Sequence, residues 1–281
     1  MEITSLRELV ERAETDGITL GRAALLLQVE QDRLDEAAVT ARMREALLVM
    51  FESVSQGLDP ATKSVSGLTG GQAAKLFAAK DAAPGGEALA RAEAYALAVA
   101  ELNASMGRIV AAPTAGACGI LPGALLSAKE RFGYSDDMLL DALFCAAGVG
   151  AVIARRATIS GAEGGCQAEV GSAAAMAAAA LSQLAGTPPR ACAKAAGFAL
   201  MNLMGLVCDP VQGLVEIPCV YRNVIGVAAA FTSADLATAD ARLPLDPDDI
   251  IDAMGRVGRS LPRDLRETGR GGCASCKVCQ S

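Results

Sequence analysis

Apolar residues recur every three or four positions along most of this 281-residue chain, and polar or glycine-rich breaks separate the runs. This period predicts amphipathic helices. The expected helices span residues 6–13, 20–30, 34–55, 72–79, 87–106, 136–155, 167–184, 189–207, 218–231 and 246–259. No run shows the two-residue alternation of a half-buried strand. The pattern therefore predicts an all-α fold, a compact helical bundle.

The breaks divide the chain into three parts. Residues 1–56 are predicted to be N-terminal amphipathic helices that belong to the main domain or pack on it. Residues 57–268 are predicted to form the helical domain that holds the candidate site. Residues 269–281 end the chain as a flexible tail rich in cysteine.

Composition refines this picture. Hydrophobic residues make up 52% of the chain and aromatic residues only 3%, which indicates a core of small side chains. A net charge of −7 argues against a nucleic-acid partner. The most apolar stretches, 168–185 and 191–207, contain polar residues and are flanked by Gly and Pro, so buried helices fit better than membrane spans. We expect a cytoplasmic protein without a membrane partner, whose cysteines are not in disulfides.

Three cysteines stand in breaks between the predicted helices: Cys166, Cys208 and Cys219. Cys166 follows two glycines and opens a helix, where free backbone N–H groups favour a thiolate. Cys208 follows one predicted helix and Cys219 begins the next, so the three sulfurs can meet at one end of the bundle. Two interpretations stay open: free cysteines packed in an alanine-rich core, or ligands of an iron–sulfur cluster at inter-helix loops that leaves one iron without a protein ligand.

Two further breaks carry candidate binding residues. The loop KSVSGLTGG (63–71) has the Gly, Ser and Thr content of an anion-binding loop, and a helix start lies just behind it. An ordinary inter-helix loop is the alternative. Small residues of the segment 113–123 could line a site wall, whereas Cys118 could simply pack there. Cys145 and Cys192 lie inside apolar helix patterns and are predicted to be core residues.

Four motifs resemble the α chain of iron–sulfur-dependent L-serine dehydratases: SGLTGGQAAK (66–75), AAPTAGACGILPG (111–123), EGGCQAEVGSA (163–173) and GLVCDPVQGLVEIPC (205–219). The resemblance implies a [4Fe–4S] cluster held by Cys166, Cys208 and Cys219, with one open iron. It also implies an L-serine ammonia-lyase activity, L-serine to pyruvate and ammonia, without pyridoxal phosphate.

Roles for the loop residues are expectations that rest on the same resemblance. The candidate catalytic residues are Lys63, Ser66 and Thr69. The candidate residues for binding L-serine are Ser64, Gly70, Gly71, Thr114, Gly116 and Gly119.

The base that removes the α-proton of serine is harder to assign, because the chain has no histidine. The candidates are Lys63, a hydroxyl of the loop 63–71, Cys118, Glu163 and Glu169. The family occurs as one long chain or as separate α and β chains, and this chain resembles only the α part. We therefore expect a separate β chain as partner, in a heterodimer or larger oligomer, and this β chain could supply the base.

The tail departs from the family pattern. Cys273, Cys276 and Cys279 form a C-x-x-C-x-x-C run where α chains of the family have GGLA in place of GGCA. Three hypotheses compete: the tail binds a second metal, one of its thiolates caps the open iron, or it is a disordered end prone to oxidation.

Three other functions are alternatives for this sequence. A pyridoxal-phosphate lyase would need alternating strands and helices, which the pattern lacks. A related iron–sulfur lyase could act on threonine or cysteine, since no residue named above fixes the substrate side chain. The third is a non-catalytic iron–sulfur module for redox chemistry or sensing.

Overall fold

The computed structural model describes residues 3–277, and its fold is all-α, as predicted. The helices are α1 (Leu6–Asp16), α2 (Leu20–Asp32), α3 (Glu36–Gly57), α4 (Gln72–Ala78), α5 (Glu87–Ala104), α6 (Ile120–Phe132), α7 (Asp136–Arg156), α8 (Gly161–Gly164), α9 (Ser172–Leu184), α10 (Pro189–Leu203), α11 (Cys219–Thr238) and α12 (Pro247–Ser260). No strand occurs between residues 3 and 277, and the one isolated β-bridge joins Cys208 to Arg266.

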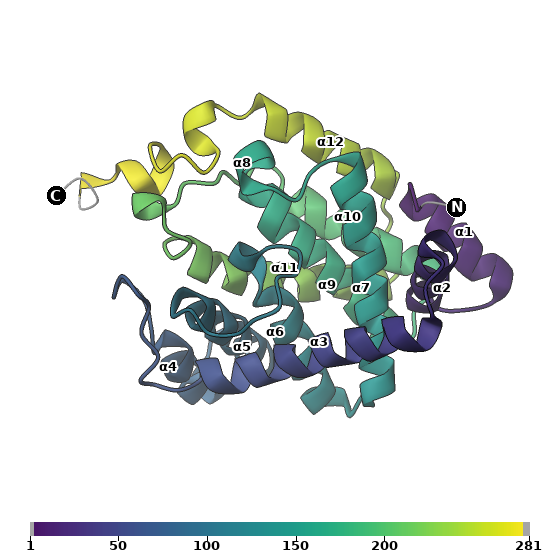
Figure 1. Ribbon diagram of the computed structural model, residues 1–281, viewed down its shortest axis with the longest axis horizontal. Coiled ribbons are helices and arrows are strands. Elements are labelled where there is room, and N and C mark those ends of the chain that lie inside the picture. Colours follow the sequence, from purple (N-terminus) through teal and green to yellow (C-terminus); the bar gives the residue numbers. More distant parts are fainter. Residues whose placement is uncertain (1–2, 278–281) are drawn as a thin grey trace.

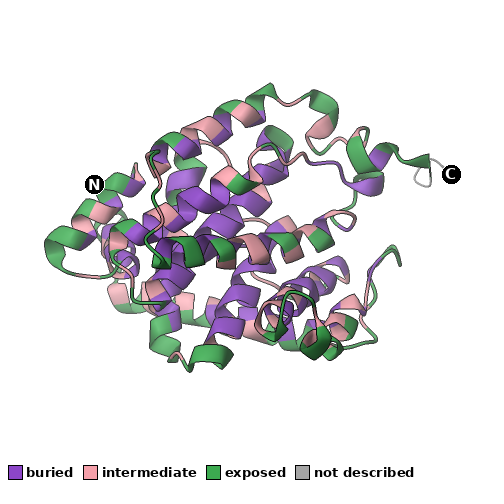
Figure 2. Ribbon diagram, turned by 180° about the vertical axis from the view of Figure 1, so that it is seen from behind, coloured by how far each residue is buried: buried purple, intermediate pink, exposed green. Residues whose placement is uncertain are grey.

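Helix α9 lies at the centre of the bundle, where α7, α10 and α11 pack around it (Figure 1). Every residue of α9 except Gln183 is buried, and most of them are alanines (Figure 2). Small side chains let the backbones of neighbouring helices approach closely. At Gly119, for example, a Cβ atom would lie 2.0 Å from the carbonyl oxygen of Ala96 on α5. The predicted small-residue core is confirmed.

The N-terminal helices pack directly on this bundle. Asp248, at the start of α12, accepts hydrogen bonds from the backbone N–H groups of Leu6 (2.8 Å) and Arg7 (3.1 Å). These groups belong to the first turn of α1, whose N–H donors have no partner within the helix. Helix α2 packs along α7. The first helices are thus attached to the bundle through α12 and α7.

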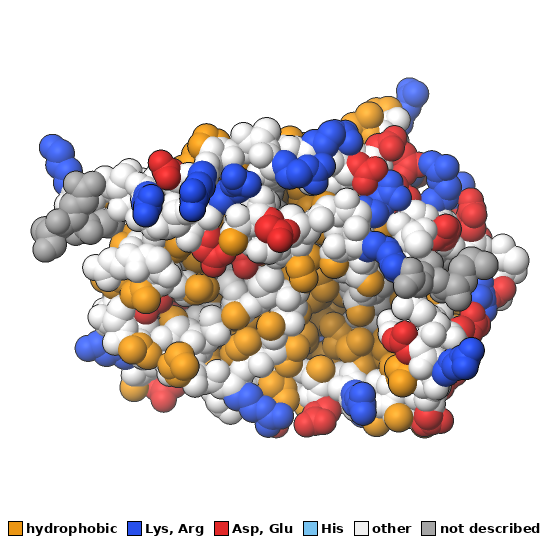
Figure 3. Space-filling view, turned by 45° about the horizontal axis from the view of Figure 1, so that its top comes forward, with side chains coloured by type: hydrophobic (Ala, Val, Ile, Leu, Met, Phe, Trp, Pro, Cys, Tyr) orange, Lys and Arg blue, Asp and Glu red, His pale blue; other side chains and the backbone are white. Residues whose placement is uncertain are grey.

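One helix has the length and composition of a membrane span, but most of it is buried inside the protein. Among the described residues, α7 is long and apolar enough to cross a membrane by length and composition, with a mean hydropathy of 1.8, but 67% of that window is buried inside the protein. Core helices of soluble proteins pass the same test. The stretches 168–185 and 191–207 form α9 and most of α10, and both are largely buried. Hydrophobic side chains also reach the surface, in a hollow across the middle of the face seen in Figure 3. The cytoplasmic location stays a prediction.

Glu101 on α5 organises the loop that precedes α4. Its side chain is completely buried, and its carboxylate accepts three hydrogen bonds of 3.1 Å from the backbone N–H groups of Gly70, Gln72 and Ala73. A carboxylate in this position neutralises the positive end of a short helix and satisfies donors that would otherwise be buried without partners. The loop 63–71 is therefore held against α5.

Glu101→Ala is expected to lower the free energy of unfolding by about 3 kcal/mol, because three backbone N–H groups lose their acceptor in a buried setting. Urea denaturation, followed by circular dichroism, measures the change. Glu52→Ala, at an exposed position of α3, is the matched control and should change the value by less than about 0.5 kcal/mol. Equal stability of the two variants would contradict the bracing role of Glu101.

Candidate functional site

Two of the predicted ligand cysteines meet a carboxylate at one end of the bundle. Cys166 follows α8 and Gly165, a glycine with φ +77°, and precedes a π-helical turn that carries Glu169. Cys208 follows α10, and its backbone N–H donates to the carbonyl of Leu265 (2.9 Å). The sulfur atoms of Cys166 and Cys208 and a carboxylate oxygen of Glu169 lie within 4.8 Å of one another. These three donors form a group that could hold a metal ion.

Cys219, the third predicted ligand, is the first residue of α11 and is buried beside them. Burial, together with negative charge on Cys166 and Glu169, raises the pKa of its thiol to about 12. These effects place Cys219 in the electrostatic neighbourhood of the other two cysteines. Cys219 therefore lies near the other two cysteines, but its sulfur is not one of the three donor atoms that lie within 4.8 Å of one another.

The thiols of Cys166 and Cys208 interact directly. A hydrogen bond from Cys208 is the main cause of the lowered pKa of Cys166, and the Arg222 guanidinium lowers it further. The same bond, together with burial, raises the pKa of Cys208 well above its usual range. Cys166 is therefore the thiol of this pair that ionises first, and a thiolate is the form that binds metal.

Glu169 is largely enclosed, and glycines surround it. Burial raises the pKa of its carboxyl group. A Cβ atom at Gly161 would lie 2.6 Å from Glu169 Oε2 and 3.2 Å from Cys208 Sγ, and one at Gly116 would lie 3.4 Å from Glu169 Oε1. Thr114 Oγ1 is buried without a hydrogen bond of normal geometry, although the hydroxyl is close enough to lower the pKa of Glu169. Thr114 and Gly116, both predicted to bind substrate, thus line the site around Glu169.

Asn223 holds two walls of this site together, and the sequence reasoning missed it. It is buried on α11, where its side-chain Nδ2 donates to the carbonyls of Gly116 (2.8 Å) and Cys219 (3.0 Å). Its Oδ1 accepts from the backbone N–H of Gly119 (2.9 Å). Gly119 therefore contributes a backbone hydrogen bond and packs closely on α5. The side-chain amide of Asn223 links the segment 113–123 to the start of α11.

The loop 63–71 reaches the same region through Glu216, a buried residue shortly before Cys219. Ser66 Oγ donates to Glu216 Oε2 at 2.6 Å, and Thr69 Oγ1 donates to the same oxygen at 3.4 Å. Ser64 Oγ accepts from the N–H groups of Gly67 and Thr69 and so shapes the loop itself. Two predicted catalytic hydroxyls thus lie against the segment that carries Cys219.

The proposed anion site at the start of α4 is already filled by the chain. Its N–H groups bind the Glu101 carboxylate, so they do not offer the free donors that the loop composition indicated. Close packing explains why two positions of the loop are glycines. A Cβ atom on Gly70 would lie 2.3 Å from the carbonyl oxygen of Thr62, and one on Gly71 would lie 2.7 Å from the carbonyl oxygen of Pro60. Lys63 is exposed. Contact of these residues with substrate stays a prediction.

The other candidate groups lie elsewhere or pack in the core. Glu163 is exposed and accepts a hydrogen bond from Thr158. Cys118 is fully buried, and burial raises the pKa of its thiol to about 12, which fits a packing role. Cys145 and Cys192 are buried in the main core as predicted, and a hydrogen bond between them raises the pKa of Cys145.

The described part of the tail docks next to Cys208. The N–H of Glu267 donates to the Cys208 carbonyl (2.8 Å), and the N–H of Cys273 donates to Asp209 Oδ2 (2.7 Å). Cys273 and Cys276 are exposed. Cys279 lies outside the described residues, so the role of the three tail cysteines stays a prediction.

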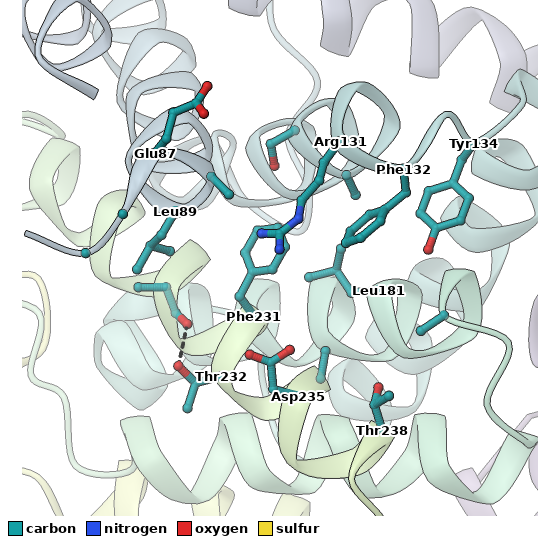
Figure 4. A pocket seen from close by; sticks show the side chains of 18 residues that line it. Glu87, Leu89, Arg131, Phe132, Tyr134, Leu181, Phe231, Thr232, Asp235 and Thr238 are labelled. Atoms are coloured by element: carbon teal, nitrogen blue, oxygen red, sulfur yellow. Dashed lines mark hydrogen bonds between the residues drawn. The ribbon is translucent and has the colours of Figure 1, made fainter. Parts of the chain in front are cut away.

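A cavity of about 710 Å³ lies away from the cysteines, between the start of α5 and the ends of α6, α9 and α11 (Figure 4). Arg131, Phe132, Phe231 and Asp235 point toward its interior. No cysteine lines it. The candidate site is thus defined by its donor atoms and not by this cavity.

The residues at the cysteine site fit a metal centre. They offer three buried sulfurs and one carboxylate, and the absence of a side chain at Gly116 and Gly161 lets the backbone pack closely against Glu169 and Cys208. Thiolates are the ligands that iron–sulfur clusters use in proteins. Arg222, whose side chain is 14% exposed, supplies a compensating positive charge nearby.

Comparison with known proteins shows the family of the chain. The model of the serine dehydratase alpha chain family matches residues 6–274. A probable L-serine dehydratase alpha chain of Bacillus subtilis is 41% identical over 273 residues, which cover 96% of this chain and 91% of that protein. The L-serine dehydratase alpha chain of Peptoniphilus asaccharolyticus is 38% identical over 280 residues, 99% and 96% of the two chains.

A longer relative aligns over a part of its length. L-serine dehydratase TdcG of Escherichia coli is 45% identical over 190 residues, which cover 66% of this chain and 41% of that protein. The family match takes in all three site cysteines, Glu169 and the loop 63–71. The chain belongs to the serine dehydratase alpha chain family.

Proposed function

We propose that this chain is the α subunit of an L-serine dehydratase, a lyase that converts L-serine to pyruvate and ammonia. The convergence of Cys166, Cys208, Cys219 and Glu169 carries the proposal, because it gives the family's chemistry a site. Relatives whose names state this activity align with the chain over nearly its whole length, which supports the same conclusion.

The cofactor we propose is a [4Fe–4S] cluster held by Cys166, Cys208 and Cys219. When bound, such a cluster would supply an iron without a protein ligand, a Lewis acid that assists departure of the serine hydroxyl. The chain's own task is to supply three thiolates, to exclude water, and to place polar groups beside the reacting carbon. The lowered pKa of Cys166, caused mainly by the hydrogen bond from Cys208, favours the metal-binding form of that thiol.

Glu169 is the residue we propose as acceptor of the α-proton. Of the candidates named from the sequence, it is the one whose ionisable group lies with the sulfurs of Cys166 and Cys208. Thr114 and Gly116 enclose its carboxylate, which would fix its position relative to a bound substrate. Ser66 and Thr69 are proposed to contact L-serine from the loop 63–71, where both hydroxyls donate to Glu216.

A separate β chain is the proposed protein partner. Two relatives that align with nearly the whole chain, those of Bacillus subtilis and Peptoniphilus asaccharolyticus, are named alpha chains. Apolar side chains close to the Ser66–Glu216 contact are exposed: Val65 (76%), Leu68 (48%), Leu214 (37%) and Val215 (39%). Exposed apolar side chains that gather at one place indicate a surface that binds another molecule.

Anaerobic reconstitution tests the function. The purified chain is incubated with iron and sulfide, with and without a candidate β chain, and assayed for pyruvate from L-serine. We expect about four iron and four sulfide ions per chain, and pyruvate formation that decays in air because an iron without a protein ligand is easily lost. Reconstituted complex that binds the cluster yet forms no pyruvate would contradict the proposed reaction. Threonine and cysteine in place of serine test the substrate.

A further inference from the structure

Arg222 joins the helix that begins at Cys219 to the segment that carries Cys208, and it lies close to Cys166. It lies on the first turn of α11, three residues after Cys219. Its Nη1 donates to the carbonyl of Val207 (2.7 Å), and its Nη2 pairs with Asp209 Oδ1 (2.7 Å), so both neighbours of Cys208 bind it. Its guanidinium is also close enough to Cys166 to lower the pKa of that thiol. One side chain thus links α11, the segment around Cys208 and Cys166.

The guanidinium is held rigidly and largely out of water. The side chain of Arg222 is 14% exposed and that of Asp209 is 4% exposed. Asp209 is fixed in turn, because it also accepts a hydrogen bond from the backbone N–H of Cys273 at 2.7 Å. An arginine with two anchors of this kind keeps its charge at one place and cannot lose its proton.

The charge balance at the site calls for such a group. Three thiolates and the carboxylate of Glu169 would bring four negative charges into a buried region, and two iron(II)/two iron(III) with four sulfides add only two positive charges. Unpaired buried charge is costly, and the cost falls when a fixed opposite charge lies nearby. Arg222 is placed to supply that charge without occupying a coordination position.

We propose that Arg222 is a positioning residue whose fixed positive charge retains the anionic iron–sulfur centre and raises its reduction potential. The inference rests on the proposed cluster. Groups outside the first ligand shell commonly change metal affinity by ten- to a hundredfold. Asp209 and the Val207 carbonyl orient the guanidinium. The segment that supplies Cys208 therefore also fixes the position of the positive charge.

Two variants at this position separate charge from bracing. Arg222→Gln removes the charge and Arg222→Lys keeps it, while Arg190→Gln, an exposed arginine paired with Glu14, is the control. After anaerobic reconstitution of each chain, the rate of cluster loss to a chelator is followed by visible absorbance, and the midpoint potential is measured. We expect cluster loss about tenfold faster in Arg222→Gln, a more negative midpoint potential, and recovery of both values toward wild type in Arg222→Lys.

The other outcomes decide between the inference and the proposal beneath it. Wild-type rates and potential in Arg222→Gln would overturn the inference. The inference would also be overturned if Arg222→Lys lost its cluster as fast as Arg222→Gln and had the same lowered midpoint potential. That result would show that Arg222 supports the structure of the site and that its charge has no role. A wild-type chain that takes up no iron and sulfide would overturn the proposed cofactor itself, and with it this inference.

Discussion

Serine in place of Cys166, Cys208 or Cys219 is expected to abolish cluster binding and to lower pyruvate formation by at least about a thousandfold. A serine hydroxyl keeps the size of the side chain but is not ionised at neutral pH and is a poor ligand for iron in a cluster. Loss of several kcal/mol of Lewis-acid stabilisation corresponds to a rate loss of this order. Iron and sulfide content per chain and the rate of pyruvate formation measure the two effects.

Cys192→Ser is the matched control, because Cys192 is just as buried but lies near the start of α10, beside Thr187, whereas Cys208 follows the other end of that helix. It should bind a full cluster and turn over serine like wild type. Cys219→Ser is the most informative of the three ligand variants. The group of donors within 4.8 Å contains Cys166, Cys208 and Glu169, and not Cys219. Full iron content in Cys219→Ser would show that Cys219 is not a ligand.

The helical fold and the site cysteines could be predicted from the sequence because both signals are local. Apolar residues at helical spacing identify a buried face whatever it packs against. Glycines beside Cys166 and prolines near Cys208 and Cys219 mark breaks, and breaks at one end of a bundle converge. The resemblance then gave three separate cysteines one common role.

Long-range polar contacts could not be predicted in this way. Glu101 on α5 accepts hydrogen bonds from the backbone N–H groups at the start of α4, although it lies about thirty positions away in the sequence. Asn223 and Arg222 occupy ordinary positions of an apolar helix, and only folding brings their polar groups against Gly119 and Asp209. The composition of the glycine-rich loop indicates free N–H groups. It gives no sign that the carboxylate of Glu101 accepts hydrogen bonds from them.

Glu169→Gln is expected to lower pyruvate formation by about a hundredfold or more while the iron and sulfide content stays at the wild-type value. The carboxamide has the shape of the carboxylate but cannot accept a proton, and general-base catalysis is commonly worth 10²- to 10⁴-fold. Exchange of the α-proton of L-serine with D2O, followed by NMR, reports on the same step. It should fall in parallel with turnover. Glu52→Gln on the exposed face of α3 serves as the control.

The result also distinguishes the two roles that the geometry allows. A carboxylate oxygen within 4.8 Å of two thiol sulfurs could be a metal ligand, and in that case Glu169→Gln would lose iron together with activity. Full turnover with a full cluster would exclude both roles and transfer the base to the β chain, since this chain has no histidine. We expect the cluster to be retained and turnover to be lost, because the proposed cluster takes its three protein ligands from Cys166, Cys208 and Cys219, and Thr114 and Gly116 fix the carboxylate of Glu169 beside them.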